Sequence, residues 1–287
     1  MDQERAARYC LLIGGVFWGL YWLPLKQVEA AGLSGSAPSA SVFAAAFVMI
    51  LPLALWRLKS LRARARDLCG AGLLAGLSIG LFTAALTQTE IVRAILLFYL
   101  TPVWSTALGM FVLGHKPTLA RFATLALGLV GLCVVLGIDD GLPVPRNIGD
   151  AMALISGISW SLASLKMYRM PLVPLPDLIV AFVTGCAAVT GALLLLSGQG
   201  MAGDAVGTAL PWVIFTAIYI VPTLAMTLWP ATMLTPARAG LLLMTEVVAG
   251  VISAALLSGE PFGVQEMLGT VLITAALLSE VFRPEKT

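Results

Sequence analysis

Ten long apolar segments constrain the fold of this chain more than any other feature. A helix needs about 20 apolar residues to cross the hydrocarbon core of a bilayer. Ten runs of roughly this length lie at residues 9–28, 39–58, 67–87, 89–112, 118–138, 148–169, 176–197, 209–229, 235–258 and 262–282. Lipid admits only helices and closed barrels, and barrel strands need alternating polar positions, so the runs predict an all-α integral membrane protein with ten transmembrane helices.

Composition supports a membrane protein. Hydrophobic residues make up 59% of the 287 residues and charged residues only 11%, whereas soluble domains carry about 25% charged residues. The connections between the runs are short, so we expect no attached soluble domain. The basic residues are scattered over loops and form no single face, so no nucleic-acid partner is expected.

The placement of Lys and Arg predicts that both termini are cytoplasmic. With the N-terminus inside, 14 of the 17 basic residues fall on the cytoplasmic side, and Lys26, Arg93 and Arg146 fall outside. Cytoplasmic loops of membrane proteins carry such an excess. A count of nine or eleven helices would scramble this bias.

The two halves of the chain repeat one another. "GVFWGL" (15–20) resembles "GISWSL" (157–162), and "VRAILLFYLTPV" (92–103) resembles "ARAGLLLMTEVV" (237–248). Each half therefore holds five helices, and an odd number means that the second copy enters the membrane from the opposite side. The predicted domains are residues 1–140 and 141–287, two inverted five-helix repeats around a central cavity. Inverted repeats are typical of secondary transporters.

The same segments resemble a known family. "FWGLYWLPLK" and "RAILLFYLTPVWSTALGMFVLGHKPT" are similar to an EamA repeat of the drug/metabolite transporter superfamily, and "ARAGLLLMTEVVAGVISAALLSGEPFGVQEMLG" resembles the family's other repeat, including the pair Gly259–Glu260. The resemblance implies ten helices, a cavity between the halves, and export of small metabolites across a bacterial inner membrane. "FYLTPVWSTAL" looks like the YddG-like branch, which exports aromatic and other amino acids. The sequence departs from the family pattern at His115, where Gly-Glu is common, and at Val247, where Pro is common.

Glu246 is the only ionisable residue that lies near the middle of any predicted helix. Intramembrane acids usually face the bundle interior and mark substrate or proton pathways. Glu246 is therefore a candidate contact for a substrate ammonium or a proton-carrying site. The alternative is a neutral, structural side chain held by hydrogen bonds from a neighbouring helix.

Aromatic residues on the predicted pore-facing helices are the second set of candidates. Their rings can stack on an apolar substrate or hold a cation over a ring face. Trp18 and Trp160 occupy equivalent positions in the two repeats and are expected to meet near the pseudo-two-fold axis. The alternative role is interfacial anchoring, which suits Trp22, Trp104, Trp212 and Trp229. The candidate substrate-binding residues are Trp18, Tyr21, Tyr99, Trp160, Tyr219 and Glu246.

Small residues, prolines and charge pairs suggest moving parts. Gly72, Gly76 and Gly80 share one helix face, which allows close packing or, alternatively, sliding. Prolines inside helices act as hinges or as static bends. Charge pairs at the outer ends form a gate or are ordinary interfacial charges. The candidate gate and hinge residues are Lys26, Glu29, Gly76, Glu90, Arg93, Pro102 and Pro222.

Several chemistries find no support. The sequence has no GxxxxGK[ST] loop and no HExxH, and a single histidine leaves no Ser/His/Asp set. Its four cysteines are isolated in apolar runs, so neither zinc nor disulfides are expected. We therefore expect no catalytic residue, no metal and no cofactor, and a protein that is not an enzyme.

These observations predict a secondary transporter that exports small amphipathic metabolites by alternating access. Amino acids with large apolar side chains are the favoured substrates, and helices 1, 3, 4, 6, 8 and 9 would build the cavity. Two alternatives stay open: efflux of organic cations or drugs, and an integral-membrane enzyme that modifies lipid. The expected partners are a small-molecule substrate and the lipid bilayer, with a monomer expected and a dimer left open.

Overall fold

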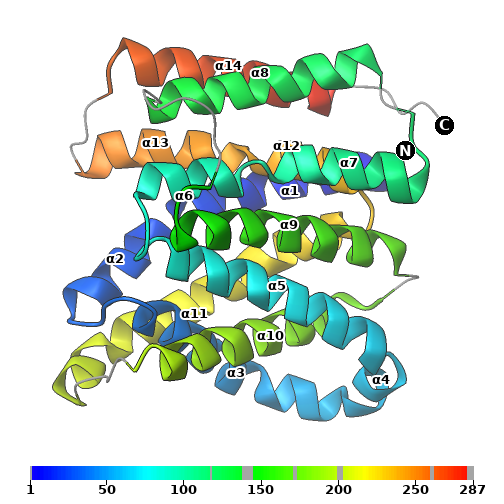
Figure 1. Cartoon of the computed structure of the whole chain (residues 1–287). Helices are drawn as coiled ribbons and strands as arrows, with labels where there is room; N and C mark the ends of the chain where they lie inside the picture. Colours follow the sequence, from blue (N-terminus) through cyan, green and yellow to red (C-terminus); the bar gives the residue numbers. More distant parts are fainter. Residues whose placement is uncertain are drawn as a thin grey trace.

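The computed structural model describes residues 2–116, 118–137, 145–170, 173–198, 203–258 and 262–282, and its regular structure there is entirely helical (Figure 1). The helices are α1 (Asp2–Leu20), α2 (Trp22–Ala30), α3 (Ala37–Trp56), α4 (Leu58–Ala63), α5 (Ala65–Ala85), α6 (Ile91–Phe98), α7 (Thr101–Leu113), α8 (Leu119–Leu136), α9 (Ile148–Arg169), α10 (Leu175–Leu196), α11 (Gly203–Ala231), α12 (Pro236–Leu243), α13 (Thr245–Ser258) and α14 (Val264–Val281). The predicted all-α fold class is confirmed.

Ten helical stretches in the described residues are long and apolar enough to cross a membrane, as predicted. They are Gln3–Ala30, Ala37–Trp56, Ala65–Ala85, Ile91–Leu113, Leu119–Leu136, Ile148–Arg169, Leu175–Leu196, Asp204–Ala231, Pro236–Leu257 and Val264–Val281. We number them as spans 1 to 10. The predicted domain boundary at residue 140, the Gly259–Glu260 pair and the basic residues after α14 lie outside the described residues.

Three spans are interrupted inside the membrane. Span 1 breaks at Tyr21, span 4 at Tyr99 and Leu100, and span 9 at Met244. Pro102 follows the second break and lies in the first turn of α7, where its missing N–H breaks no helical hydrogen bond. The breaks of spans 4 and 9 lie 145 residues apart, the same offset that aligns the two sequence segments.

Threonine side chains satisfy carbonyl groups at these two breaks. The Thr101 hydroxyl donates to the carbonyl of Phe98 at 2.5 Å, and the Thr245 hydroxyl donates to the carbonyl of Leu242 at 2.6 Å. Lipid offers no partner for a freed backbone group, so side-chain hydrogen bonds of this kind make a broken helix tolerable at membrane depth.

The helices run roughly parallel in layers (Figure 1). α8 and α14 lie side by side at one edge, α3, α10 and α11 lie toward the opposite edge, and α5 and α9 lie between. The first turns of α1 lie beside the last turn of α14, where the Arg8 side chain donates to the carbonyl of Val281 at 2.8 Å. The start of span 1 and the end of span 10 therefore lie on the same side of the bundle.

Glycines allow α5 and α10 to approach closely. A Cβ atom at Gly72 would collide with the carbonyl oxygen of Ala181, and one at Gly76 with that of Gly185. At Gly80 it would lie 2.7 Å from a methyl group of Val189. The glycine face of span 3 is thus a close-packed contact with span 7.

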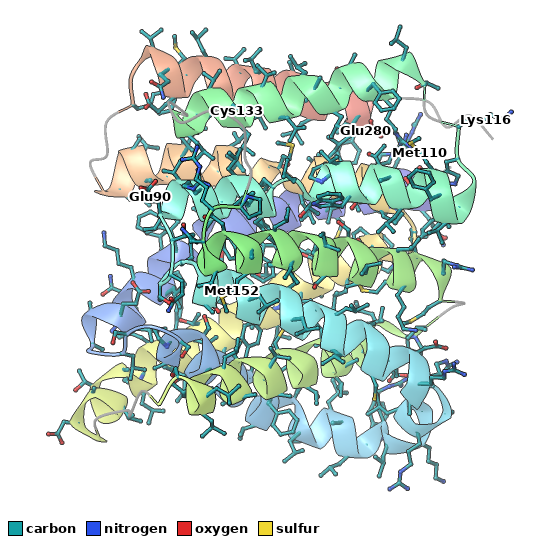
Figure 2. The ribbon with its side chains drawn as sticks, in the orientation of Figure 1. Glu90, Met110, Lys116, Cys133, Met152 and Glu280 are labelled. Atoms are coloured by element: carbon teal, nitrogen blue, oxygen red, sulfur yellow. The ribbon has the colours of Figure 1, made fainter. Side chains whose placement is uncertain are left out.

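Buried ion pairs lie at opposite ends of the bundle. At one end Arg93 of α6 pairs with Asp150 of α9 at 2.6 Å, and at the other Arg238 of α12 pairs with Glu280 of α14 at 2.9 Å. Figure 2 shows Glu90, at the start of α6, and Glu280 at these two ends. Both aspartate and glutamate side chains in these pairs are fully buried, so each needs its arginine to offset the loss of water.

A third ion pair ties span 2 to span 7. Arg57, which follows α3, donates to the buried carboxylate of Asp177 in α10, and Ser60 donates to the same carboxylate at 2.5 Å. The hydrogen bond to Asp177 raises the pKa of Arg57 above its usual value. Arg57 therefore stays ionised over the physiological pH range.

Candidate functional site

A central cavity of about 430 Å³ lies between the interrupted spans. This volume falls in the range of about 300–1,000 Å³ that small-molecule sites occupy. The lining residues are Trp18, Gly19, Tyr21, Trp22, Leu25, Ser39, Phe43, Ser78, Ile79, Phe82, Thr83, Leu86, Ile95, Phe98, Tyr99, Thr101, Pro102, Leu136, Trp160, Gly240, Leu243, Glu246, Val247, Gly250 and Val251. They come from spans 1, 2, 3, 4, 5, 6 and 9.

Aromatic rings dominate the cavity wall. Eight of the 25 lining residues are Phe, Trp or Tyr, whereas these residues make up 8% of the chain. Phe98 contacts Phe82 with ring centroids 4.7 Å apart and Tyr99 edge-on at 5.3 Å. A wall of this kind suits an apolar or aromatic ligand body, and its ring faces attract cations.

Glu246 provides the one carboxylate among the lining residues that the structure describes, and none of them is Lys, Arg or His. It lies in the first turn of α13, where the helix dipole favours negative charge. The hydroxyl group of Tyr99, a residue at the break of span 4, donates a hydrogen bond to the Glu246 carboxylate. The cavity is therefore apolar and aromatic around one acidic group.

Trp18 and Trp160, which align in the two similar sequence segments, both line the cavity, from α1 and from α9. The Trp18 indole donates to the Thr227 hydroxyl at 2.9 Å, and its ring meets Tyr21 edge-on at 5.6 Å. The ring of Trp160 contacts Phe182 at 6.2 Å. Among the ring contacts of the described residues none joins the two tryptophans, so they face one cavity without stacking on each other.

The model of the EamA-like transporter family matches residues 7–137, and these residues supply most of the cavity wall. The first half of the chain is therefore similar to the EamA-like transporter family. Glu246 and the rest of span 9 lie beyond the matched EamA-like region.

Two individual proteins resemble the chain. An uncharacterized transporter of Archaeoglobus fulgidus is 27% identical over 177 residues, which cover 59% of this chain and 63% of that protein. The chain thus spans less than two thirds of this curated relative. A solved structure, described as the crystal structure of a protein, superposes with a TM-score of 0.75 at 19% identity, over 97% of this chain and 96% of the other. Its likeness establishes the fold, and none of these names specifies a substrate.

Tyr219 lies outside the cavity, contrary to its prediction as a substrate contact. Its hydroxyl donates to the carbonyl of Phe17 at 2.6 Å, and the two rings stack at 5.5 Å. Span 8 contributes no lining residue, although we expected it to build the wall; spans 2 and 5 contribute Ser39, Phe43 and Leu136 instead. The side of α11 that carries Tyr219 packs on α1, which keeps it from the cavity.

The predicted hinge and sliding residues occupy different surroundings. Pro102 lines the cavity beside the break of span 4, and its Cα atom would lie 3.4 Å from a Cβ atom at Gly240. Pro222 lies within α11, which continues past it, and is exposed. Gly76 lies in the α5–α10 contact described above, outside the cavity lining.

The predicted outer gate residues lie near one end of the bundle with other partners. Lys26 lies 5.6 Å from the ring centre of Trp22, and the side chains of Lys26 and Glu29 are exposed. Arg93 pairs with Asp150, while Glu90 is exposed. The i,i+3 spacing predicted that Arg93 pairs with Glu90 on the same helix, whereas Arg93 pairs with Asp150 on α9.

Sequence reasoning missed several residues of the EamA-like half that line the cavity. Phe43, Phe82 and Phe98 add rings, and Ser78 adds a hydroxyl. None carries a polar or paired signal that separates it from an ordinary core position. Trp22, assigned to interfacial anchoring, also lines the cavity and donates to Ser253 at 3.0 Å.

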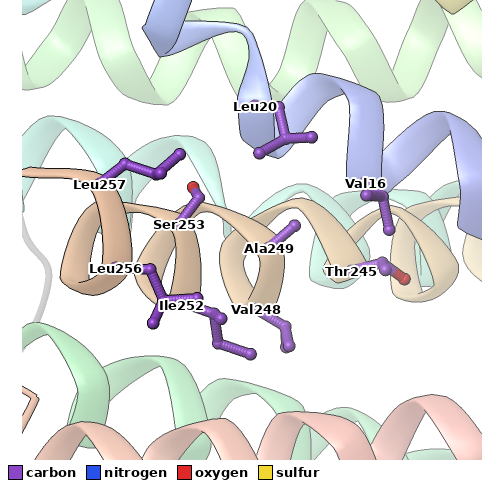
Figure 3. Close-up of a pocket in the computed structure, with 9 residues that line it drawn as sticks. All are labelled: Val16, Leu20, Thr245, Val248, Ala249, Ile252, Ser253, Leu256 and Leu257. Carbon is purple, nitrogen blue, oxygen red and sulfur yellow. The ribbon is translucent and has the colours of Figure 1, made fainter.

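A second hollow of about 440 Å³ opens on the outer surface between α1 and α13 (Figure 3). Its wall is formed by Val16, Leu20, Thr245, Val248, Ala249, Ile252, Ser253, Leu256 and Leu257. Leu256 and Leu257 are exposed, as expected of side chains that face acyl chains. α1 and α13 approach closely at Gly19, where a Cβ atom would lie 2.7 Å from that of Ala249.

Proposed function

We propose that the chain is a secondary transporter that exports small amphipathic metabolites carrying an amine, amino acids with large apolar side chains above all. One observation carries this proposal: where the broken spans 4 and 9 meet, the described lining of an aromatic cavity holds one carboxylate, that of Glu246. Transporter substrate sites are commonly built at discontinuous helices near the bilayer midplane. The rings would bind the apolar body, and Glu246 would bind the ammonium group.

The packing of the spans supports two inverted repeats as the moving units. Spans 3 and 7 pack together through α5 and α10, and spans 8 and 2 through α11 and α3. Spans 4 and 6 pack through α7 and α9, and spans 9 and 1 through α13 and α1. Each second pairing is the first one shifted by five spans, as a pseudo-two-fold relation between residues 1–140 and 141–287 requires. Alternating access would follow from rocking of one unit against the other.

The breaks of spans 4 and 9 are the proposed hinges, with Pro102 beside the first. The proposed orientation places both termini in the cytoplasm, on the side where Arg8 meets the end of α14. The chain would work as a monomer, because the cavity is enclosed by spans of one chain.

Efflux of organic cations is the second candidate function. The described cavity lining contains no Lys, Arg or His, which favours this function. A substrate that carries a positive charge and no carboxylate would need only Glu246 to balance its charge. Such a substrate would need no donor for an anionic end.

Exchange in proteoliposomes separates the two candidates. Vesicles would be loaded with a radiolabelled aromatic amino acid, and unlabelled amino acids, aromatic amines and quaternary ammonium compounds would be offered outside. We expect amino acids to drive exchange of the label. If the label is not exchanged, while labelled organic cations are, cation efflux replaces our first proposal; if neither moves, both are wrong.

A further inference from the structure

Two residues that line the cavity carry a hydroxyl group for which the described part of the chain offers no hydrogen-bond partner. The hydroxyl oxygens are the Oη atom of Tyr21 and the Oγ atom of Ser78, and both atoms are buried. Ser78 as a whole is 1% exposed. Buried hydroxyls are almost always hydrogen-bonded, and an unmet one is unfavourable, so each such group in a native protein needs an explanation, of which a bound water, ion or ligand is one.

Ser78 differs from other hydroxyl residues on these helices. A helical Ser or Thr usually donates to a carbonyl of its own preceding turn. Thr83 does so, with the carbonyl of Ile79 at 3.0 Å, and Thr190 does so with Cys186 at 2.7 Å. At Ser78, a lining residue of the cavity, the backbone carbonyl accepts a hydrogen bond from Ser156 at 2.7 Å, while the Ser78 hydroxyl has no partner among the described residues.

Tyr21 occupies the break of span 1, between α1 and α2. Its ring lies edge-on to Trp18 and packs against the core that includes Phe43 and Cys186. The residue at the break of span 1 is therefore a tyrosine whose hydroxyl is buried and has no hydrogen-bond partner among the described residues.

The charges of the cavity define what these hydroxyls can bind. Glu246 can match an ammonium group, but no cationic side chain among the described lining residues can match a carboxylate. Carboxylates accept strong hydrogen bonds from neutral donors when no cation is available. A zwitterion held at Glu246 would thus leave its anionic end to the free hydroxyls.

We infer that Tyr21 and Ser78 bind the carboxylate of an α-amino acid whose ammonium group lies at Glu246. This inference rests on the proposed transport function and deepens it. The two hydroxyls are then the groups that distinguish an amino acid from the amine with the same side chain. They give the cavity a preference that its single acid alone would not provide.

The test compares tryptophan with tryptamine, which shares the ring and the amine but lacks the carboxylate. Ligand affinity is measured on the purified protein by thermal shift, and transport by exchange in proteoliposomes. In Tyr21→Phe and Ser78→Ala we expect the affinity for tryptophan to fall about tenfold or more, because a hydrogen bond to a charged group is lost, while tryptamine affinity is unchanged. Thr190→Val is the matched control, since the Thr190 hydroxyl donates to its own helix and Thr190 does not line the cavity, and it should leave the ratio of the two affinities unchanged.

Three outcomes would overturn the inference. Equal losses for both ligands would assign the hydroxyls a structural role, and unchanged affinities would place them away from the ligand. A wild-type protein that binds tryptamine but not tryptophan would contradict the inference and favour cation efflux. Binding with the predicted discrimination but without exchange would refute the transport proposal and leave the carboxylate site standing.

Discussion

Glu246 has a hydrogen-bond donor but no cationic partner in the cavity wall that the structure describes. A carboxylate in such surroundings must carry a proton or be balanced by a cation, because an unpaired buried charge is unfavourable. The proposed substrate ammonium is that cation. Protons and substrate therefore compete for one group.

Glu246→Gln tests this competition. We expect substrate affinity at neutral pH to fall about tenfold or more, since a charge-assisted contact becomes a neutral one. In the wild type, affinity should decline as the pH falls and the carboxyl group takes up a proton, and in the variant this pH dependence should vanish. The measurement is exchange at several pH values, with Tyr99→Phe as the control that keeps the acid and removes its hydrogen-bond donor. Wild-type transport by the variant at every pH would mean that Glu246 is structural.

Trp18→Ala and Trp160→Ala test the role of the rings. If both rings hold the apolar body of the substrate, transport of tryptophan or phenylalanine should fall much more than transport of alanine. Trp18→Phe keeps a ring but removes the hydrogen bond to Thr227, so it should retain most of the preference for large substrates. Equal losses for large and small substrates would indicate that the tryptophans serve packing.

At the scale of helices, the sequence predicted that ten spans exist and approximately where each begins and ends, but it did not predict the breaks within spans 1, 4 and 9. Each of the ten runs is predominantly apolar, so length and hydropathy located the spans within a few residues. Pro102 hinted at the break of span 4. The break at Met244 has no adjacent proline or glycine to mark it, yet it lies 145 residues after Tyr99, so the offset between the two similar sequence segments was the usable signal.

The candidate site was predicted in part for a similar reason. Charged and bulky polar residues in apolar runs attract attention, and Glu246, Trp18, Tyr99 and Trp160 line the cavity. Partners on distant helices could not be predicted from spacing, as the pairing of Arg93 with a residue 57 positions away shows. Nor could the sequence separate a phenylalanine of the cavity from one of the core, since both present the same apolar pattern.

The contact between α5 and α10 gives a prediction about stability. Gly72→Ala places a methyl group against the backbone carbonyl of Ala181, which cannot move cheaply, so we expect a loss of about 1–3 kcal/mol. Gly191→Ala is the matched control on α10, because its added methyl group meets open space and should be neutral or slightly stabilising, by about 0.5–1 kcal/mol. Thermal unfolding of the purified variants measures both. Similar melting temperatures for the two would mean that the helices slide apart readily.

For the molecule as a whole, the proposal requires that one cavity serve both sides of the membrane. The buried pairs Arg93–Asp150 and Arg238–Glu280 hold helices together at opposite ends of the bundle. Between these ends lie the two breaks and the cavity that they share. Rocking about the breaks would expose Thr101 and Glu246 first to one side and then to the other.

Cysteine accessibility tests this requirement most directly. The four native cysteines, Cys10, Cys69, Cys133 and Cys186, would be replaced by serine. Thr101→Cys would then be introduced in the cavity wall, and Leu257→Cys in the wall of the second hollow, between α1 and α13, would be the control. We predict that a membrane-impermeant thiol reagent modifies the cavity cysteine from either face of oriented vesicles, that substrate protects it, and that the control is neither modified efficiently nor protected. Modification from one face only, in a variant that still exchanges substrate, would contradict alternating access through this cavity.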